Sequence, residues 1–446
     1  MGNYVNNLRF DNDFERYVLK GFDINTMSTG KFHVELNNIT RVESTLICGI
    51  CKDSYVQQSQ RYVKNDESMF RWMTFDNVLL EEEFKSLCRQ SMSIYERMTE
   101  LKPESMGKVR TTIDDYKWGI PIEDARYILP LACKTNMSIT MEGKKFELFI
   151  SLLYYMSDSI SKELFNELMI NIQRANVKLF VCIRKMLKKY GKGDRNPVNK
   201  YFKNDLKFES MTPKYYDIKD GTVRDLAVAT LMSSSTDPVK ELETNYSTYE
   251  EQKELILRVA GKGHYSILEQ NRFTTDTFCS LTCYHQLIRH RLYNIMPMGL
   301  IQLGRSKQSQ YMIPETIRSS KFYRECDEVI SEWSDFIHRA LEQEPRNYNC
   351  LGALLNCQII PFKLNTNIRA DIDVMKQRLC MNAQWEIRQF MQDRKTYLTC
   401  TSFGDIYKKF AKPNCMTIGC QEGNYAHPDC KASGRCNGKQ KEVENE

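Results

Sequence analysis

Two stretches of this chain repeat each other weakly, and this repeat constrains the fold more than any other feature of the sequence. In the first stretch, a strand-like run at residues 32–36 is followed by a helical segment and then by a polar loop at residues 54–61. In the second stretch, a strand-like run at residues 272–278 leads into a helical segment that ends at Arg291. Because self-similarity of this kind indicates repeated structural units, the sequence predicts two related domains.

The later parts of the two stretches also correspond. Each has a short apolar segment followed by a helix, and in the first stretch this helix is expected at residues 146–156. Between them, Gly191, Gly193 and Pro197 stand among many charged residues, a composition typical of a domain boundary. We therefore expect a first copy at residues 1–190, a linker at 191–211, a second copy at 212–410 and a tail at 411–446.

Apolar residues also recur at helical spacing in two segments of the second copy, at residues 250–260 and 322–341. Leu255 and Ile256 lie on one face of the first segment, and Ile330 and Trp333 lie on one face of the second. This spacing predicts an amphipathic helix in each segment.

The composition is that of a protein with substantial hydrophobic cores, because 41% of the residues are hydrophobic and 11% are aromatic. No apolar run reaches the roughly 18 residues that a membrane span needs, and polar residues come early at the N-terminus, so we expect neither a membrane partner nor a signal peptide. Most of the sixteen cysteines should then be reduced, in a cytoplasmic protein, and the free ones should pack as small hydrophobic residues. The net charge of +6 suits anionic small molecules and does not predict nucleic-acid binding.

Polar motifs in the two copies complement each other. The first copy has a loop with Ser54, Ser59 and Arg61, and the second has the Arg-His-Arg tripeptide from Arg289 to Arg291. Joined, they read Arg-His-Arg-x-x-Ser-x-x-x-x-Ser-x-Arg, which resembles the signature of flavin-dependent thymidylate synthases. The chain is therefore interpreted as two degenerate copies of that family's fold that build one composite active site. The resemblance implies an α+β fold, with a mixed sheet flanked by helices in each copy.

The resemblance also implies which residues bind each small molecule. Residues expected to bind dUMP come from both copies: Gln57, Ser59, Gln60, Arg61 and Arg126 from the first, and Gln286, Arg289 and Arg378 from the second. Those expected to act in catalysis are Ser59, Arg61, Arg289 and Arg378. Those expected to bind FAD are Ser233, His264, Ser266, Glu269, Arg289, His290, Arg291, Asn367, Arg369 and Asp373. Arginine suits these roles because its guanidinium group binds phosphates and uracil carbonyls bidentately and does not lose its charge.

Each copy has lost the half of the site that the other copy keeps. Residues 49–51 of the first copy read Gly-Ile-Cys where Arg-His-Arg is expected, and Leu351 of the second copy stands where the family has an arginine. Within the retained halves, Gln57 replaces an acid and Asp373 replaces an amide. Neutral decay would not sort its losses between the copies in this way, so the pattern favours a working site.

The implied reaction is the reductive methylation of dUMP to dTMP, with methylenetetrahydrofolate as carbon donor and NADPH as the reductant of FAD. The flavin carries out the difficult chemistry, and the protein binds, orients and polarises. The family's homotetramer implies a homodimer that forms a pseudo-tetramer, and the sequence leaves open whether one site is built within one chain or across two. The alternatives are a non-catalytic flavin- or nucleotide-binding partner protein and a pyrimidine nucleotide hydroxymethylase on the same fold.

The tail raises a separate question about zinc, which thiolate and imidazole ligands could hold. The candidate ligands are Cys415, Cys420, His427, Cys430 and Cys436. Their spacings are loose and no CxxC pair occurs, so we favour a reduced, flexible or adventitiously oxidised tail and expect no metal among the site residues.

Overall fold

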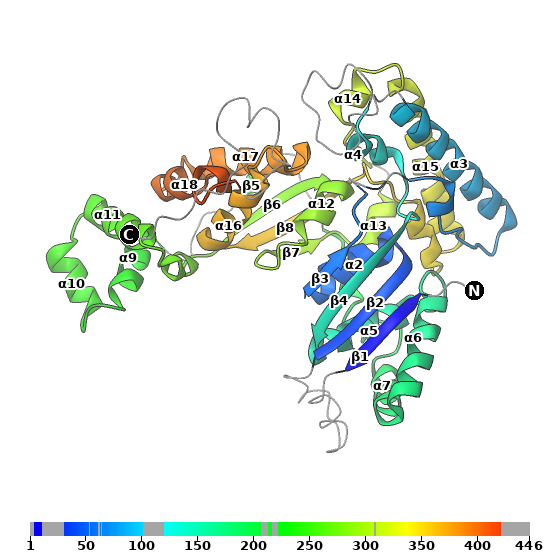
Figure 1. Cartoon of the computed structure of the whole chain (residues 1–446), viewed down its shortest axis with the longest axis horizontal. Coiled ribbons are helices and arrows are strands. Elements are labelled where there is room, and N and C mark those ends of the chain that lie inside the picture. Colours follow the sequence, from blue (N-terminus) through cyan, green and yellow to red (C-terminus); the bar gives the residue numbers. More distant parts are fainter. Residues whose placement is uncertain are drawn as a thin grey trace.

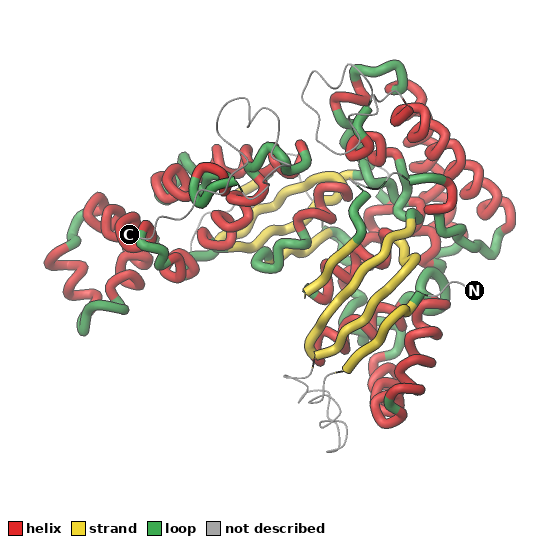
Figure 2. Tube along the Cα trace, in the orientation of Figure 1, coloured by secondary structure: helices red, strands yellow, loops and turns green. Residues whose placement is uncertain are grey.

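The computed structural model describes residues 4–10, 31–52, 54–60, 63, 65–100, 120–206, 213–215, 222–306 and 309–420. The described strands form two four-stranded sheets with the same neighbour order, β1-β2-β4-β3 and β5-β6-β8-β7 (Figure 1). The strands are β1 (Val5–Phe10), β2 (Lys31–Thr40), β3 (Ser54–Gln57), β4 (Lys134–Glu142), β5 (Lys214–Tyr215), β6 (Phe273–Ser280), β7 (Asn294–Pro297) and β8 (Ile359–Thr366). The equal topology, with helices around both sheets (Figure 2), confirms an α+β protein with two related domains.

Neighbouring strands are antiparallel throughout both described sheets, so the expectation of mixed sheets is wrong. The reason lies in the position of β4. Strands β2 and β3 are joined by a crossover helix and run parallel to each other, but β4 lies between them and is antiparallel to both. Strand β8 separates β6 from β7 in the same way.

The end of β2 buries the start of the helix that follows it. Alternate side chains of β2 face the core until the register shifts near Asn38, which has a φ of 54°, a left-handed conformation that asparagine tolerates. Thr40 then caps α2 (Arg41–Cys51) and forms a capping box with Glu43. The first turn of α2 therefore lies inside the molecule rather than at its surface.

Helices make up most of the rest of the described chain. Those of the first copy and the linker are α3 (Val78–Glu100), α4 (Ile122–Ala125), α5 (Gly143–Tyr155), α6 (Lys162–Ala175), α7 (Val177–Tyr190) and α8 (Lys200–Lys203). Those of the second copy are α9 (Val223–Leu231), α10 (Pro238–Asn245), α11 (Tyr249–Gly261), α12 (Leu281–Leu287), α13 (Leu300–Arg305), α14 (Glu315–Arg318), α15 (Tyr323–Gln343), α16 (Ile368–Arg378), α17 (Trp385–Leu398) and α18 (Gly404–Phe410). Short 3-10 helices are η2 (Glu67–Met69), η5 (Arg126–Ile128), η6 (Tyr265–Glu269), η7 (Tyr348–Ala353) and η8 (Asn414–Met416). The two periodic segments are α11 and α15, as predicted, and α9, α10 and α11 form a lobe at one end (Figure 1).

Helices α3 and α15, one from each copy, pack against each other in antiparallel orientation. Glu83 near the start of α3 pairs with Arg339 near the end of α15, and Arg97 pairs with Glu325 at the opposite ends. Between these ion pairs, Trp333 of α15 is 1% exposed and packs edge-on to a phenylalanine of α3. The copies therefore share one hydrophobic core, which is continuous from one to the other.

Backbone hydrogen bonds around η5 and η7 make a second contact between the copies. Leu131 donates to the carbonyl of Leu354 at 2.7 Å, and Cys357 donates to the carbonyl of Tyr127 at 2.9 Å. Two further backbone bonds join the copies here, from Asn356 to the carbonyl of Leu129 and from Ala132 to the carbonyl of Gly352. This pairing fixes the segment that follows η5 against the second copy.

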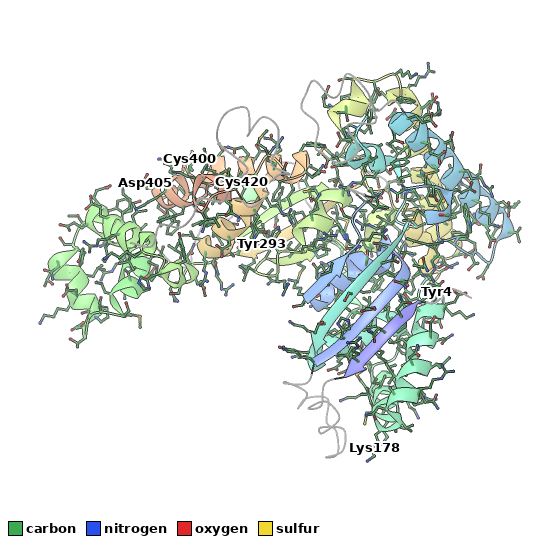
Figure 3. All side chains as sticks on the ribbon, viewed as in Figure 1. Tyr4, Lys178, Tyr293, Cys400, Asp405 and Cys420 are labelled. Atoms are coloured by element: carbon green, nitrogen blue, oxygen red, sulfur yellow. The ribbon has the colours of Figure 1, made fainter. Side chains whose placement is uncertain are left out.

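The described cysteines are free and mostly buried, which confirms the prediction that they pack as small hydrophobic residues. In the part of the chain that the structure describes, no helix has both the length and the apolar character that a bilayer crossing requires. Figure 3 draws the described side chains, with Tyr4 labelled beside the first sheet and Tyr293 beside the second.

Candidate functional site

Helix α12 presents the part of the motif that the second copy retains. Ser280 begins the helix by accepting a hydrogen bond from the backbone N–H of Cys283 at 3.1 Å. Every residue of this short helix is buried, including Gln286 in its last turn. Arg289 follows shortly after the end of the helix, so the local fold carries its side chain to the contact with the first copy.

Gln57 of β3 makes that contact. Its amide oxygen accepts hydrogen bonds from a guanidinium nitrogen of Arg289 at 3.0 Å and from Nε2 of His285 at 2.7 Å. Its amide nitrogen donates to Ser44 at 3.0 Å and to Thr135 at 3.3 Å. The structure therefore joins the retained loop of the first copy to the retained helix of the second within one chain.

His285 is held in one neutral form by this network. Because Arg289 can only donate, the Gln57 atom that it contacts is the oxygen, and Nε2 of His285 must carry the proton. Nδ1 of His285 then accepts from the hydroxyl of Thr45, 2.8 Å away. Burial and the nearby positive charges of Arg41 and Arg289 lower the pKa of His285 well below its usual value.

The rest of the predicted loop lies close to the same contact. Ser54 accepts a hydrogen bond from Arg291 at 3.3 Å, and Ser59 is half-buried. Gln60 is 4% exposed, and its side-chain nitrogen and oxygen have no hydrogen-bond partner among the described residues. Arg61, which is predicted to bind dUMP, lies outside the described residues.

Arg126 is brought to the site by η5. Its side chain is 4% exposed, and its Nε donates to the carbonyl of Glu123 at 3.0 Å. Its own carbonyl accepts from Asn356 of the second copy at 3.0 Å. The positive charge of Arg126 is close enough to lower the pKa of His285. Arg126 and Arg289, predicted from opposite copies, therefore lie near each other.

Arg41, which no sequence motif marks, completes this arginine cluster of Arg41, Arg126 and Arg289. It is the first residue of α2 and is 4% exposed. Burial, followed by the charges of Arg289 and Arg126, lowers the pKa of Arg41 to about 9. Its Nε and NH1 atoms have no hydrogen-bond partner among the described residues, and neither does Nε of Arg289. Such a cluster suits an anion that carries more than one negative charge.

Arg378, at the end of α16, reaches the site from the other side. Its Nε donates to Nε2 of His290 at 2.7 Å, so this histidine nitrogen is an acceptor and carries no proton. Burial and the charges of Arg378 and Arg289 lower the pKa of His290 to about 3. His290 is therefore neutral at physiological pH.

Residues predicted to bind FAD gather where η6 meets the start of α16. Asn367 caps α16 by accepting from the backbone of Ala370 at 2.8 Å. Arg369 forms an ion pair with Glu269 of η6 and lies 3.9 Å from a carboxylate oxygen of Asp373. These charged groups are partly exposed and so remain accessible to a ligand.

Three other predicted residues lie around this group on exposed positions. His264 immediately precedes η6, and Ser266 lies within it. Ser233 follows α9 and donates to the carbonyl of Thr230 at 3.3 Å. The structure thus brings η6 and α16 together. Ser233 lies just after the end of α9, in the lobe.

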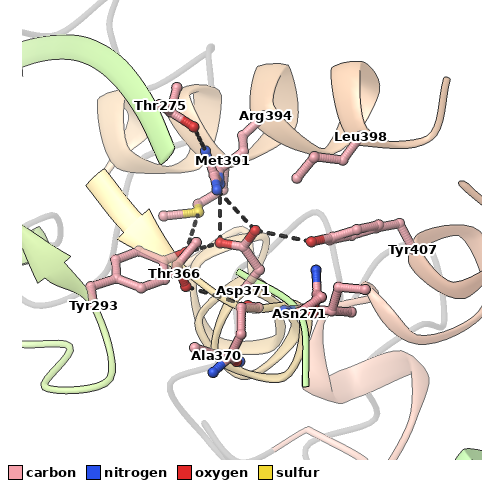
Figure 4. Close-up of polar contacts among 12 residues, drawn as sticks. Asn271, Thr275, Tyr293, Thr366, Ala370, Asp371, Met391, Arg394, Leu398 and Tyr407 are labelled. Atoms are coloured by element: carbon pink, nitrogen blue, oxygen red, sulfur yellow. Dashed lines mark hydrogen bonds and ion pairs between the residues drawn. The ribbon is translucent and has the colours of Figure 1, made fainter. Parts of the chain in front are cut away.

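A buried ion pair fixes α16 in place (Figure 4). Arg394 of α17 donates to both carboxylate oxygens of Asp371 at 3.0 Å and also to Thr275 of β6 at 2.9 Å. Tyr293 and Tyr407 donate to the same carboxylate at 2.8 and 3.0 Å. No sequence motif identifies this network, which ties the predicted flavin helix to the strand and helices around it.

A second buried network joins η5 to the second copy. The hydroxyl of Tyr127 donates to Glu386 at 2.5 Å and accepts from Gln384 at 2.7 Å. Glu386 also accepts from the backbone N–H of Ser280 at 2.7 Å, and Gln384 accepts from Gln286 at 3.5 Å. This network positions both the residue after Arg126 and the start of α12.

A cleft of about 590 Å³ adjoins the end of α16. Its walls include Asp373, Lys376 and Arg378 of α16, together with Asn414 and Cys415 of the tail. The first part of the tail therefore lines the predicted flavin region, which the sequence did not indicate. Among the described residues no group of His, Cys, Asp and Glu could hold a metal ion. The remaining zinc candidates lie outside the described residues: His427, Cys430 and Cys436.

Comparisons with known proteins agree with the two-copy arrangement. A family model described as thymidylate synthase complementing protein matches residues 12–158 and 217–398. The flavin-dependent thymidylate synthase of Pyrococcus furiosus is 33% identical over 187 residues, which cover 39% of this chain and 74% of that protein. The enzymes of the same name from Pyrococcus abyssi and Thermococcus onnurineus are 30% and 29% identical, with the same shares covered. Because the family match extends through both copies, this chain belongs to the flavin-dependent thymidylate synthase family of enzymes, as a tandem two-copy member.

Proposed function

We propose that this chain converts dUMP to dTMP by reductive methylation, with methylenetetrahydrofolate and NADPH as co-substrates, at a composite site built from both copies of one chain. The observation that carries the proposal is the contact of Gln57 with Arg289 and His285. This contact joins the two halves of the family motif that the copies retain separately.

The arginine cluster supports an anionic nucleotide as the substrate. Its guanidinium groups come from both copies and would hold a phosphate group through charge-assisted hydrogen bonds. Gln286 is buried, and its amide oxygen has no partner among the described residues, so it suits a donor such as the N3–H of uracil. Arginine donors fixed in a buried site would also stabilise charge that develops on a uracil oxygen.

The polar surface at η6 and α16 fits a flavin dinucleotide. Arg291 and Arg369 are only partly engaged by other residues and offer guanidinium donors to a diphosphate. The cleft beside Arg378 supplies a concave wall. Bound FAD would provide the hydride for the reductive step, and the chain's own residues would bind and orient the nucleotide beside it.

The mass of the nucleotide product tests this proposal. Purified protein is incubated with FAD, NADPH, methylenetetrahydrofolate and dUMP, and the nucleotides are analysed by mass spectrometry. We expect a product that carries one additional methyl group, with none formed when the folate is omitted. A hydroxymethyl product would identify a different reaction on the same fold, and unchanged dUMP beside protein-bound FAD would contradict the proposed activity.

A further inference from the structure

Arg41 is an unusual residue in the core of the first copy. It is 4% exposed, and nothing among the described residues accepts a hydrogen bond from its Nε or NH1 atoms. A guanidinium group retains its charge even when it is buried. The folded protein therefore bears the desolvation cost of a cation whose hydrogen bonds to the described residues are incomplete.

The one carboxylate of α2 does not neutralise Arg41. Glu43 is fully buried, and one of its oxygens accepts from Thr40 and pairs with Arg71 at 2.9 Å. Its other oxygen accepts from Ser161 at 2.7 Å. Both oxygens of Glu43 are therefore engaged with residues other than Arg41.

The second copy shows that the fold does not require an arginine at this position. Thr40 and Ser280 each cap the helix that follows the corresponding strand, so Arg41 and Leu281 are equivalent first residues. Leu281 is 2% exposed and fills its position with an apolar side chain. An arginine thus occurs in one copy at a site where the other copy packs a leucine.

Arg41 lies on the face of α2 that meets the second copy. Thr45 follows it by one helical turn on the same face and bonds to His285 at 2.8 Å. Arg126 of η5 and Arg289 after α12 are the other charged groups that act on Arg41 from neighbouring elements. Three guanidinium groups from three elements therefore converge, and within the described residues Arg41 Nε and NH1 and Arg289 Nε have no hydrogen-bond partner.

We propose that Arg41 is a further substrate-binding residue, whose Nε and NH1 atoms donate hydrogen bonds to the phosphate group of the nucleotide. This inference rests on the proposed function. A phosphate dianion would supply a counter-charge to Arg41 and Arg289, whose buried donors have no partner among the described residues, and its oxygens match the fork of donors on a guanidinium group. The buried charge lowers the free energy of unfolding, and binding of the nucleotide raises it again.

Arg41→Leu tests this inference, because it installs the side chain that the second copy uses at the equivalent position. Isothermal titration calorimetry measures the Kd of dUMP and of deoxyuridine, which lacks the phosphate. We expect the affinity for dUMP to fall about 10- to 100-fold, as for lost charge-assisted hydrogen bonds, and the affinity for deoxyuridine to change less than about threefold. Thermal unfolding without ligand should occur at the wild-type temperature or higher, because a buried uncompensated charge has been removed.

Two leucine variants serve as controls. Arg394→Leu removes a buried arginine that has a carboxylate partner and should lower the unfolding temperature. Arg184→Leu removes an exposed arginine of α7 and should change neither the unfolding temperature nor the affinity. Arg41→Lys keeps the positive charge but loses the planar set of guanidinium donors. We expect its affinity for dUMP to lie between those of the wild type and Arg41→Leu.

The inference is overturned if Arg41→Leu destabilises the protein as Arg394→Leu does, since Arg41 would then be a structural residue. It is equally overturned if the variant binds dUMP with wild-type affinity, or if dUMP and deoxyuridine are weakened by the same factor. Failure of the wild-type protein to bind dUMP at all would overturn the proposed function, and the role of Arg41 with it.

Discussion

At the scale of single residues, two histidines beside the arginine cluster must stay neutral for their hydrogen bonds to exist. His290 accepts from Arg378, and His285 accepts from Thr45. A protonated imidazole has no acceptor atom, and its charge would be repelled by the arginines around it. The two histidines therefore add no positive charge to the site, and the charge of the arginines persists across the physiological pH range.

The neutral state of His290 predicts that acid destabilises the fold. Its imidazole titrates near pH 6.5 in the unfolded chain, whereas burial and the neighbouring arginines lower its pKa in the folded protein to about 3. Between these values the unfolded state binds more protons, so stability is lost as the pH falls, by up to about 1.4 kcal/mol per pH unit. We expect His290→Gln, whose amide oxygen can still accept from Arg378, to lose less free energy of unfolding than the wild type between about pH 7.5 and 5.5.

Urea unfolding at the two pH values measures this difference. His264→Gln, which replaces an exposed histidine, is the matched control. The same pH dependence in the wild type and in both variants would show that His290 does not contribute to acid sensitivity.

Site residues that belong to a sequence motif could be predicted from the sequence, whereas site residues that only the packing of the fold brings to the site could not. Gln57, Arg126 and Arg289 belong to such motifs, and the structure brings them to one region. Arg41 belongs to no such motif, and an arginine in the first turn of a helix is usually exposed. Arg41 is buried because the first turn of α2 lies inside the molecule, and neither hydrophobic alternation nor turn composition indicates that placement.

At the scale of elements, regular apolar spacing predicted several helices and strands but not the pairing of strands. The run at residues 146–156 became α5, and the run at 32–36 became the centre of β2. Alternation sets the face on which a strand is buried, but it does not set the neighbours of that strand. The position of β4 between β2 and β3 makes the sheet antiparallel, and the sequence pattern alone could not predict it.

The ion pair between Asp371 and Arg394 predicts how firmly α16 is held. Arg394→Leu leaves Asp371 buried without its counter-charge, so we expect the free energy of unfolding to fall by roughly 3–5 kcal/mol in urea titrations. Adding Asp371→Asn should restore part of this loss, because the uncompensated charge is then removed. If the double variant is instead less stable by the sum of both single losses, the two residues are not coupled.

At the scale of the whole molecule, the chain makes within itself the kind of contact that two related subunits would make. Equivalent elements face each other, α3 against α15 and η5 against η7. The repeat in the sequence predicted two copies. It did not predict which surfaces meet, because the contacts rest on backbone groups and on core residues such as Trp333 that belong to no motif.

This arrangement leads to a prediction about how sites are distributed among chains. Because Gln57, Arg126 and Arg289 converge within one chain, we expect every working site to need both copies of the same chain. Arg126→Ala and Arg289→Ala should each reduce dTMP formation at least about 100-fold, as for loss of a preorganised charged donor. We propose that the chain forms a homodimer, so the two variants are co-expressed with different affinity tags, and dimers that contain both chains are isolated by successive purification on the two tags.

We expect the mixed assembly to be as inactive as either variant alone, since neither chain then holds a complete site. Arg184→Ala, paired with each variant in turn, is the control, because its chain keeps both halves of the site and should restore activity. Recovery of dTMP formation in the assembly of Arg126→Ala with Arg289→Ala would mean that the halves meet across chains. The contact between Gln57 and Arg289 would then belong to the core shared by the two copies rather than to the place where the nucleotide reacts.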